Sequence, residues 1–411
     1  MELSRPSSHT SAQQALDPAI KEIAACFSPG SILSAEPFQS DEFSLVFLVR
    51  SKAEGLEKKW CLKRHTQTTS EQLSLRQSIM TGLKKRGCLL IPQLIESSDG
   101  RFHVEGLGAH WSACTYIEAD PAFAWSKPGW KKEHCLSAGA ALARFHAAGR
   151  SLLTTVPHKK ALLLAEADRT RLLLPVWLET SLEHARETLS EQGLARDPLL
   201  NSVVQSAPRL MENLKDVLGE IARLRQGDGH CLPVNDKQIS IGSTGTSQCL
   251  LTTVVHGDFH PGNVLFFGAD VKAILDFDHL QAGSPMYDLG YAAVMFCSLP
   301  GPHAQGNWLA GFAPESAARA DCLDQSLLAA LLSGYKQGLF TENSEEQANR
   351  ETEFKQILAG PALNLYIQLS CHLLIYWLLQ KYPHSDARQK VFVRDILARS
   401  LALLSSTNCA K

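Results

Sequence analysis

Residues 254–276 read V-V-H-G-D-F-H-P-G-N-V-L-F-F-G-A-D-V-K-A-I-L-D, and this stretch decides the fold. Two apolar, β-rich runs, Val264–Phe267 and Val271–Leu275, flank a turn at residues 268–270. Strand-like runs on both sides of a short Gly-containing turn predict a β-hairpin. Polar residues flank this hairpin: His256, Asp258 and Asn263 precede it, and Asp276 follows its second run.

The spacing from Asp258 to Asn263 has a chemical meaning. Catalytic loops for phosphoryl transfer use Asp-x-x-x-x-Asn, in which the Asp accepts the proton of a hydroxyl group and the Asn holds a metal ion. Magnesium prefers hard oxygen ligands and few protein carboxylates, so Asp276 would complete a Mg²⁺ site. The stretch therefore predicts magnesium-dependent phosphoryl transfer.

Three motifs in chain order carry a resemblance to a known family. The loop His256–Asn263 matches H-G-D-x-H-x-x-N at every fixed position, Leu275–Asp278 corresponds to I-D-F-[DE], and Tyr287–Gly290 matches Y-D-L-[AG]. Three linked motifs within about 35 residues are hard to obtain by chance. The chain resembles the aminoglycoside phosphotransferase/choline kinase-like (APH) superfamily of small-molecule kinases.

The resemblance implies an α+β fold of the protein-kinase-like, two-lobed type. A small antiparallel β-sheet lobe with one helix would precede a large, mainly helical lobe. We expect three parts: a flexible tail and leading helix at 1–30, a nucleotide-binding lobe at 31–113, and a catalytic and substrate-binding lobe at 114–411. The third part is expected to contain a loop insertion at 227–248.

Local patterns give further expectations. A turn is predicted over Pro37–Glu42 and a strand over Leu89–Ile95. The segment Ser70–Arg86 is predicted to be a helix capped by Thr69 or Ser70. A later helix should be kinked or split at Pro175, because proline removes a helical hydrogen bond. The apolar segment Leu363–Leu379 is too short and too polar to span a bilayer, which favours a buried core helix.

On the nucleotide side, the strand Trp60–Lys63 ends in a lysine. The resemblance implies that Lys63 contacts the α- and β-phosphates of ATP, and the alternative is a solvated lysine in a basic run. A kinase holds this lysine with a glutamate from the following helix. Glu71 is the only Glu in that helix, but it lies earlier than the family position, where Arg76 or Gln77 stands.

The flap over the phosphates is where the chain departs most from the family. Residues 38–43 contain no glycine and carry Asp41 and Glu42, so only Ser40 is kept as a flap contact. Glycine allows close approach of the backbone to phosphate, and its absence puts flap contacts in doubt. The hinge is expected near residues 114–118, where backbone groups of Cys114 and Tyr116 would meet adenine.

The resemblance also assigns roles to the motif residues. Asp258 is the expected catalytic base, and Asn263 with Asp276 would coordinate Mg²⁺. His256 is expected to brace the loop, while His260 is either structural or a contact to phosphate or acceptor. Asp278 either supports the metal ligands or is a solvated loop acid. The last of these residues, Asp288, fits a helix N-cap and should also accept hydrogen bonds from amides of the catalytic loop.

Composition narrows the class of protein. The formal net charge is −2, which suggests neither a nucleic acid nor an anionic membrane as partner. Eleven cysteines occur without a C-x-x-C pair, which favours reduced thiols in the cytoplasm. The polar residues 1–14 lack the apolar core of a signal peptide.

The function predicted from these features is ATP-dependent transfer of the γ-phosphate to a hydroxyl of a small metabolite, with Mg²⁺ as cofactor. The acceptor would be an amino alcohol, a homoserine-like compound or a sugar-like compound. One alternative is a kinase-fold ATP-binding or structural protein without efficient transfer, which the glycine-free flap favours. Another is an antibiotic phosphotransferase. A protein kinase is disfavoured because Tyr287 follows Asp276 after only about a dozen residues, which leaves no room for an activation segment.

Overall fold

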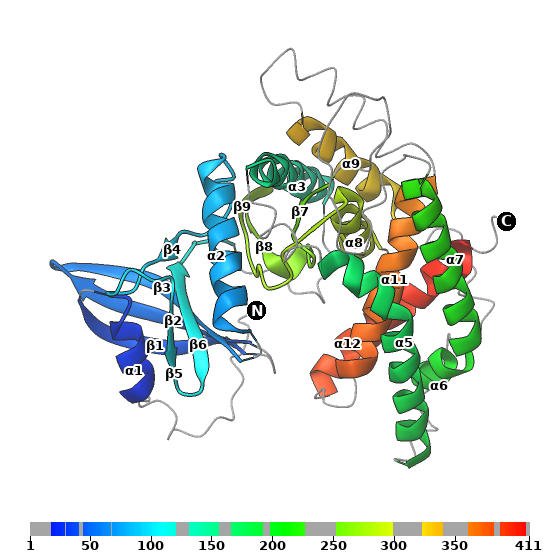
Figure 1. Cartoon of the computed structure of the whole chain (residues 1–411), viewed down its shortest axis with the longest axis horizontal. Coiled ribbons are helices and arrows are strands. Elements are labelled where there is room, and N and C mark those ends of the chain that lie inside the picture. The colour runs from blue at the N-terminus through cyan, green and yellow to red at the C-terminus, as the bar shows by residue number, and fades with distance from the viewer. Residues whose placement is uncertain are drawn as a thin grey trace, which may run out of the picture. The chain divides into compact units, whose positions relative to one another are not determined.

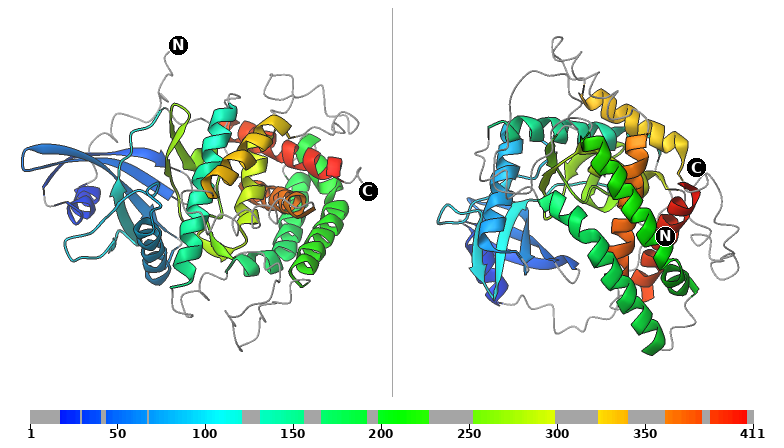
Figure 2. Two further views of the ribbon diagram at one scale, coloured as in Figure 1. Left: turned by 90° about the horizontal axis from the view of Figure 1, so that it is seen from above. Right: turned by 45° about the vertical axis from the view of Figure 1, so that its right-hand side comes forward.

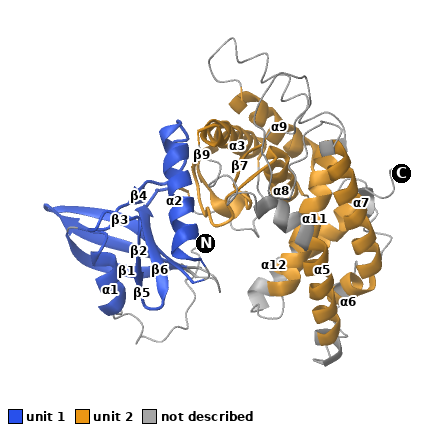
Figure 3. Ribbon diagram, viewed as in Figure 1, with its two compact units in different colours: residues 1–118 blue, residues 119–411 orange. Residues whose placement is uncertain are grey.

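The structure of the chain is a computed structural model that forms two units, Met1–Glu118 and Ala119–Lys411 (Figure 3). It describes residues 18–28, 30–40, 44–66, 68–120, 131–155, 166–191, 198–226, 252–298, 323–339, 361–381 and 387–407. The flap acids Asp41 and Glu42, the expected insertion at 227–248 and the N-terminal tail lie outside the described residues.

Unit 1 is built on an antiparallel sheet (Figure 1). Its strands are β1 (Ser31–Ser40), β2 (Ser44–Ala53), β3 (Leu56–His65), β4 (Leu94–Ile95), β5 (His103–Gly106) and β6 (Ala109–Thr115). The strand order is β1-β2-β3-β6-β4, and β5 also pairs with β6. Strands β2 and β3 are joined through Glu54 and Gly55, both at positive φ (53° and 80°), as the right-handed twist of a two-residue hairpin requires.

One face of this sheet is covered by the leading helix α1 (Pro18–Ala25). Its apolar side chains recur at helical spacing and lie in a core with strand residues such as Trp60, Leu62 and Trp111. Phe27 follows the helix, and its ring centroid lies 6.4 Å from that of Trp60. Burial of each such apolar side chain contributes about 1.5–3 kcal/mol, so the short helix is held mainly by this contact.

Helix α2 (Ser70–Lys85) begins with a capping box. The Gln72 amide donates to Thr69 Oγ1 at 3.3 Å, and the Thr69 amide donates to Gln72 Oε1 at 3.1 Å. Thr69 is thus the cap, one of the two residues the sequence offered. Gln77, which with Arg76 marks the expected position of the family glutamate, is buried and donates from Nε2 to the Phe102 carbonyl at 2.8 Å. It therefore serves the packing of α2 against β5.

Two local predictions for unit 1 are wrong. Strand β1 continues through Pro37 to Ser40, although a turn was predicted there; a register shift between Pro37 and Gln39 accommodates the proline, which has no N–H to donate. The predicted strand Leu89–Ile95 is reduced to its last two residues, β4. The apolar Ile91 is instead buried after α2, and its carbonyl accepts from Lys84 Nζ at 3.2 Å.

Unit 2 is mainly helical (Figures 1 and 3). Its helices are α3 (Lys132–Leu153), α5 (Glu166–Glu191), α6 (Pro198–Gln205), α7 (Ala207–Gln226), α8 (Pro285–Cys297), α9 (Gln325–Leu339), α11 (Pro361–Lys381) and α12 (Ala387–Thr407). Two small antiparallel pairs are β7 (Thr253–Val255) with β10 (Gln281–Gly283), and β8 (Val264–Phe267) with β9 (Asp270–Ile274). The β8–β9 pair is the hairpin predicted from the sequence, and the α+β fold class is confirmed.

Helices α3 and α9 lie side by side (Figure 2) because glycines permit close backbone approach. A Cβ built on Gly334 of α9 would collide with the Leu136 carbonyl of α3, and one on Gly139 of α3 would collide with the Leu331 carbonyl of α9. The two glycines thus act reciprocally. Helix α3 is positioned in turn against β7 and β9, next to the polar loop.

Two expectations for unit 2 concern long helices. Helix α5 runs through Pro175 without a split; Leu174, Leu178 and Leu182 are buried along one face, and this packing offsets the hydrogen bond that proline removes. Helix α11 is long and apolar enough to meet a membrane-span criterion over Ala362–Lys381, but 78% of that window is buried. The prediction of a buried core helix is therefore confirmed.

The α3–α9 contact leads to a first prediction. Gly334→Ala should destabilise the protein by about 1–3 kcal/mol because the added methyl group has no room against the Leu136 carbonyl. Gly219→Ala on α7 is the matched control. A Cβ there meets only the far end of Arg223, 4.0 Å away, so the change should be neutral or stabilise by up to about 1 kcal/mol. Urea denaturation of both variants checks this; similar midpoints would contradict the reciprocal packing.

Candidate active site

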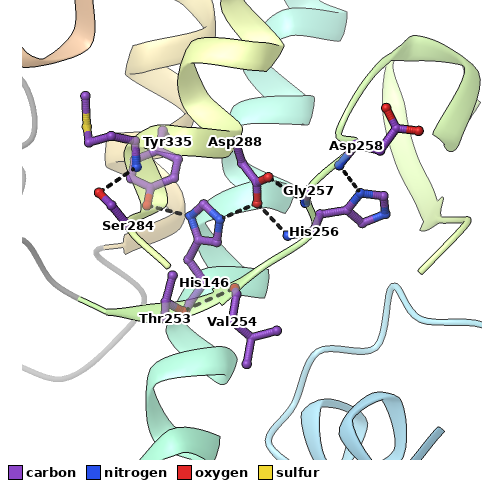
Figure 4. A network of polar contacts seen from close by, with 10 residues as sticks. His146, Thr253, Val254, His256, Gly257, Asp258, Ser284, Asp288 and Tyr335 are labelled. Atoms are coloured by element: carbon purple, nitrogen blue, oxygen red, sulfur yellow. Dashed lines mark hydrogen bonds and ion pairs between the residues drawn. The ribbon is translucent and has the colours of Figure 1, made fainter. Parts of the chain in front are cut away.

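The polar loop between β7 and β8 is anchored by Asp288 of α8 (Figure 4). Its carboxylate accepts the His256 amide at 2.7 Å through Oδ2 and the Gly257 amide at 2.9 Å through Oδ1. These are the loop hydrogen bonds that the resemblance implies for this residue. The N-cap assigned to Asp288 is wrong: Ser284 is the cap, since its Oγ accepts the Met286 amide at 3.3 Å, and Asp288 lies further into the helix.

Asp288 has a third partner from a distant part of the chain. His146 of α3 approaches Oδ2 through Nε2 at 2.9 Å, and its Nδ1 meets the Tyr335 hydroxyl of α9 at 2.8 Å. Both Asp288 and His146 are fully buried. Burial lowers the pKa of His146, although its hydrogen bond to Asp288 works in the opposite direction. His146 is therefore a core histidine whose ring nitrogens both have partners.

His256 connects the loop to the strand that ends in a metal-binding candidate. Its Nε2 donates to the Leu275 carbonyl at 2.8 Å, while its Nδ1 accepts the Asp258 amide at 3.2 Å. One ring nitrogen donates and the other accepts, so the imidazole is neutral. Burial lowers the pKa of His256, which agrees with this assignment. The residue braces the loop through hydrogen bonds, as the sequence suggested.

Gly257 cannot be replaced without rebuilding the loop. Its φ is +83°, a left-handed conformation that side chains other than glycine rarely adopt. A Cβ there would also collide with the His279 carbonyl. The glycine of the H-G-D motif therefore lets the loop turn and brings His279 alongside it.

Asp258 is held by several donors. His260 Nε2 lies 3.2 Å from Asp258 Oδ2, and Asn263 Nδ2 donates to the same oxygen at 3.0 Å. Tyr291 of α8 donates its hydroxyl to the Asp258 carboxylate as well. The side chain is still 24% exposed, so a substrate can reach it.

The charges around Asp258 set its ionisation. Burial acts to raise the pKa of Asp258, but neighbouring His260, with its hydrogen bond, and His279 hold that pKa well below the usual range. The carboxylate is thus ionised throughout the physiological range. Burial and the neighbouring carboxylate raise the pKa of Tyr291, which keeps its phenol protonated as a donor.

The metal-ligand candidates Asn263 and Asp276 are brought close by backbone pairing. The Leu275 amide donates to the Asn263 carbonyl at 2.8 Å, and Asp276 follows directly. Asn263 Nδ2 is used by Asp258, so its amide oxygen is the group that suits a hard cation. Asp276 has φ +59°, and an Asp in this strained conformation is typical of a functional position. The donor set of Asn263 and Asp276 fits Mg²⁺.

A different kind of metal site, built from three or more His, Cys, Asp or Glu side chains, is not found among the described residues.

Asp278 is half-buried two residues after Asp276, and Phe277 between them is buried. Phe277 stacks on Phe145 of α3, with ring centroids 6.2 Å apart and an interplanar angle of 24°. This apolar packing of Phe277 fixes the segment 276–278, while the carboxylates of Asp276 and Asp278 stay accessible.

The nucleotide-side candidates lie in unit 1. Lys63 on β3 pairs in register with Val46 of β2 and Ser112 of β6 and is half-buried. Glu71 lies in the first turn of α2 and is exposed. Cys114 lies on β6. Ser40 ends β1, and its side chain is outside the described residues.

Tyr116, the other hinge candidate, follows β6. Its ring lies 6.1 Å from that of Phe38 in an edge-to-face arrangement, and Lys59 Nζ lies 5.9 Å from its centroid. The structure thus places a ring from the hinge against a ring from the end of β1. Both belong to the segments that the sequence connected with nucleotide binding.

Sequence reasoning missed two residues near Asp258, namely Tyr291 and His279. Tyr291 lies three residues after Asp288 on α8, and residues at this spacing share a helix face. That spacing was a usable signal. His279 is next to Gly257 only because the chain returns after Asp276, and nothing in the sequence marked this contact.

The chain combines an antiparallel N-terminal sheet and a helical C-terminal unit with the β8–β9 hairpin, which Asp258 and Asn263 precede and Asp276 follows. This combination is typical of a class of protein, the phosphotransferases that act on small-molecule hydroxyls. The family model described as "Phosphotransferase enzyme family" (APH) matches residues 34–322. The chain belongs to this family and is a phosphotransferase with an alcohol group as acceptor.

Solved structures agree on the fold. Spectinomycin phosphotransferase in complex with ADP and spectinomycin has a TM-score of 0.50, is 14% identical, and the match covers 93% of this chain and 97% of that chain. The AMP-bound complex of spectinomycin phosphotransferase has a TM-score of 0.51 and is 15% identical, and the match covers 93% of this chain and 97% of that chain. A microcompartment-associated aminopropanol kinase has a TM-score of 0.50 and is 15% identical, and the match covers 96% of this chain and 98% of that chain. At such identities the likeness concerns the fold. A search of curated proteins found no match to the sequence.

The neutral state of His256 leads to a prediction about pH. Its pKa in the folded protein lies below the unfolded value of about 6.5, so below that pH the unfolded chain takes up a proton that the native state does not. The free energy of unfolding should fall by up to about 1.4 kcal/mol per pH unit from this group, with the loss beginning as the pH drops below about 6.5.

His256→Gln should therefore be less stable at pH 7.5 but lose less stability between pH 7.5 and 5.5 than the wild type. Urea denaturation at both pH values provides the measurement. His184→Gln, at an exposed position of α5, is the control and should keep the wild-type pH slope. An unchanged slope in His256→Gln would show that His256 is not held neutral.

Proposed function

We propose that this chain transfers the γ-phosphate of ATP to a hydroxyl group of a small metabolite, with Asp258 as the catalytic base. The observation that carries the proposal is the state of Asp258: ionised, held by His260, Asn263 and Tyr291, and still 24% exposed. A carboxylate in this state can accept a hydrogen bond from an incoming hydroxyl and orient it for in-line attack.

The residues around Asp258 divide the remaining work. Asn263 fixes the carboxylate through Nδ2, and its amide oxygen together with Asp276 would hold Mg²⁺. A bound Mg²⁺ neutralises the charge of the phosphate oxygens. In unit 1, Lys63 is proposed to contact the α- and β-phosphates, and backbone groups near Cys114 and Tyr116 to meet adenine. Complexes of spectinomycin phosphotransferase with ADP and AMP support the use of a nucleotide.

An aromatic surface beside the loop supports a choice of acceptor. His279, whose charge acts on Asp258, lies 6.0 Å from Trp377 of α11 between ring centroids. The next ring, Tyr376, lies 5.1 Å from Trp377, and it stacks on Trp177 of α5 at 5.8 Å. Trp377 is 40% exposed. Exposed ring faces attract ammonium groups, and they also stack on the apolar faces of sugars.

We therefore infer an amino alcohol or a sugar-like metabolite as acceptor, with the amino alcohol preferred. Three carboxylates on the loop and the following segment, Asp258, Asp276 and Asp278, add a negative potential that suits an ammonium group. The solved aminopropanol kinase acts on an amino alcohol and shares the fold. We place the enzyme in the cytoplasm, with no membrane or nucleic-acid partner, in keeping with its net charge of −2 and the absence of a C-x-x-C pair from its sequence.

The test of the catalytic role is Asp258→Asn. With an acceptor found in a screen of amino alcohols, sugars, homoserine-like compounds and antibiotics, phosphate transfer should fall by at least about 1,000-fold, because the hydroxyl is no longer oriented by a carboxylate. Affinity for Mg-ATP should stay within a few-fold. Asp270→Asn, at an exposed position of the β8–β9 hairpin, is the control and should keep full activity. Phosphate transfer by Asp258→Asn at a near wild-type rate would show that Asp258 is not the catalytic base.

The acceptor surface is tested by Trp377→Ala. Loss of an exposed ring face that binds an ammonium group should raise the KM of an amino alcohol about five-fold and leave the KM of ATP unchanged. Phe267→Ala removes another exposed ring, 60% accessible, at the far end of the hairpin, and should change neither constant. If the protein binds Mg-ATP but phosphorylates no compound in the screen, the result favours the alternative of a kinase-fold ATP-binding or structural protein without efficient transfer.

A further inference from the structure

Two cysteines face each other across the central strands of unit 1. Cys61 of β3 is paired in register with Cys114 of β6. Residues directly opposite each other in an antiparallel pair have Cα atoms about 4.5–5.5 Å apart. A disulfide spans Cα separations of about 4.4–6.8 Å, so the two strands hold these cysteines within bonding range. Their thiols already form a hydrogen bond with each other, and both residues are partly exposed.

The pair lies on the sheet face that carries Lys63. Side chains alternate along a strand, so Trp60 and Leu62 enter the core with α1 while Cys61 and Lys63 share the opposite face. The charge of Lys63 acts on Cys114. The dithiol is therefore next to the lysine proposed to bind the phosphates of ATP.

The two thiols are unequal, which suits them to a stepwise oxidation. The hydrogen bond from Cys114 lowers the pKa of Cys61, while that same bond and burial raise the pKa of Cys114. Cys61 is thus the nucleophile, and Cys114 is the thiol positioned to resolve an oxidised Cys61.

We propose that Cys61 and Cys114 form a modification site, a dithiol that peroxide oxidises reversibly to a disulfide and that thereby weakens nucleotide binding. The Cys61 thiolate attacks a peroxide oxygen, the O–O bond breaks, and Cys61 becomes a sulfenic acid while hydroxide leaves and is protonated to water. Cys114 sulfur then attacks Cys61 sulfur; the S–S bond forms, and the sulfenic hydroxyl leaves with the Cys114 proton as water. The two sulfurs lose two electrons in all, and the peroxide gains them.

The expected effect on the nucleotide follows from position. The disulfide would link β3 and β6 covalently at the residue pair beside Lys63, which constrains the strand position that carries this lysine. We expect affinity for an ATP analogue to fall at least about three-fold, and to return on treatment with a dithiol reductant. This part rests on the proposed function, because it assumes that Lys63 faces the phosphates. The formation of the disulfide does not.

The chain contains a matched control pair. Cys297 of α8 forms a thiol hydrogen bond with Cys135 of α3, but both are fully buried, and that bond and burial raise the pKa of Cys297 well above its usual value. Peroxide cannot reach these thiols, and neither is activated. They should stay reduced under conditions that oxidise Cys61 and Cys114.

The experiment treats the full-length reduced protein with hydrogen peroxide, blocks remaining thiols, and maps disulfides by mass spectrometry of tryptic peptides. The expected product links the peptide Trp60–Lys63 to the peptide that contains Cys114, with the Cys135–Cys297 pair unmodified. Affinity for a fluorescent ATP analogue is measured on the same samples. Cys61→Ser and Cys61→Ala should bind the analogue like the reduced wild type and should not respond to peroxide.

The proposal is overturned if no Cys61–Cys114 disulfide forms, if the buried pair oxidises equally fast, or if the disulfide forms without a change in affinity. Failure of the proposed function gives a different result, since the reduced wild type would then bind no nucleotide or transfer no phosphate. Two Cys61 variants guard against a folding defect in one of them. Agreement of the two variants with reduced wild type, together with the mapped disulfide, supports the proposal.

Discussion

The carboxylate of Asp288 is the interaction on which the rest of unit 2 depends. It is fully buried, and a buried charge is tolerated only when donors surround it. Here the donors are the amides of His256 and Gly257 and the ring of His146 (Figure 4). These donors come from the loop between β7 and β8 and from α3, and Tyr335 of α9 is connected through His146. One charge thus joins helices and loop that lie far apart in the sequence, and its removal would leave several buried donors unsatisfied at about 1–3 kcal/mol each.

This anchor stabilises a candidate site whose backbone is strained. Gly257 turns the loop at φ +83°, and Asp276 stands at φ +59°, which costs a residue other than glycine on the order of 1–3 kcal/mol. Strain of this kind persists only where surrounding contacts fix the backbone. His256 provides those contacts, because it bonds the loop on one side and the Leu275 carbonyl, next to Asp276, on the other. The loop anchor and the metal-ligand candidate are therefore linked through one neutral histidine.

How much of the fold could be predicted depends on how far apart in the sequence the interacting residues lie. The hairpin, the capping residue Thr69 and the helical nature of most of unit 2 follow from patterns within a few residues, and the sequence gives these correctly. The strand expected at Leu89–Ile95 failed because an apolar run does not reveal whether it pairs in a sheet or covers a helix end. Of the two outcomes expected at Pro175, a kink or a split, the split does not occur, because burial of the surrounding leucines outweighs the lost hydrogen bond.

The same reasoning holds for the candidate site. The motifs named Asp258, Asn263, Asp276 and Asp288, because each type of chemistry needs those groups at fixed local spacing. Tyr335, 189 residues beyond its partner His146, has no local signal at all. Contacts across such separations are determined by helix packing, here by the glycines between α3 and α9, and packing of this kind is not written in any short stretch of sequence.

The environment of Asp258 bears on the role proposed for it as the catalytic base. Neighbouring His260 and His279 hold its pKa well below the usual range, and a carboxylate of such low basicity is a weak proton acceptor. Phosphoryl transfer passes through a loose transition state in which little covalent chemistry falls to the protein, so proton removal need not be advanced when the phosphorus–oxygen bond breaks. His260, which lowers the basicity of Asp258, also fixes the direction of its carboxylate together with the donors Asn263 and Tyr291. Orientation of the acceptor hydroxyl, more than the strength of the base, is then the contribution that this arrangement favours.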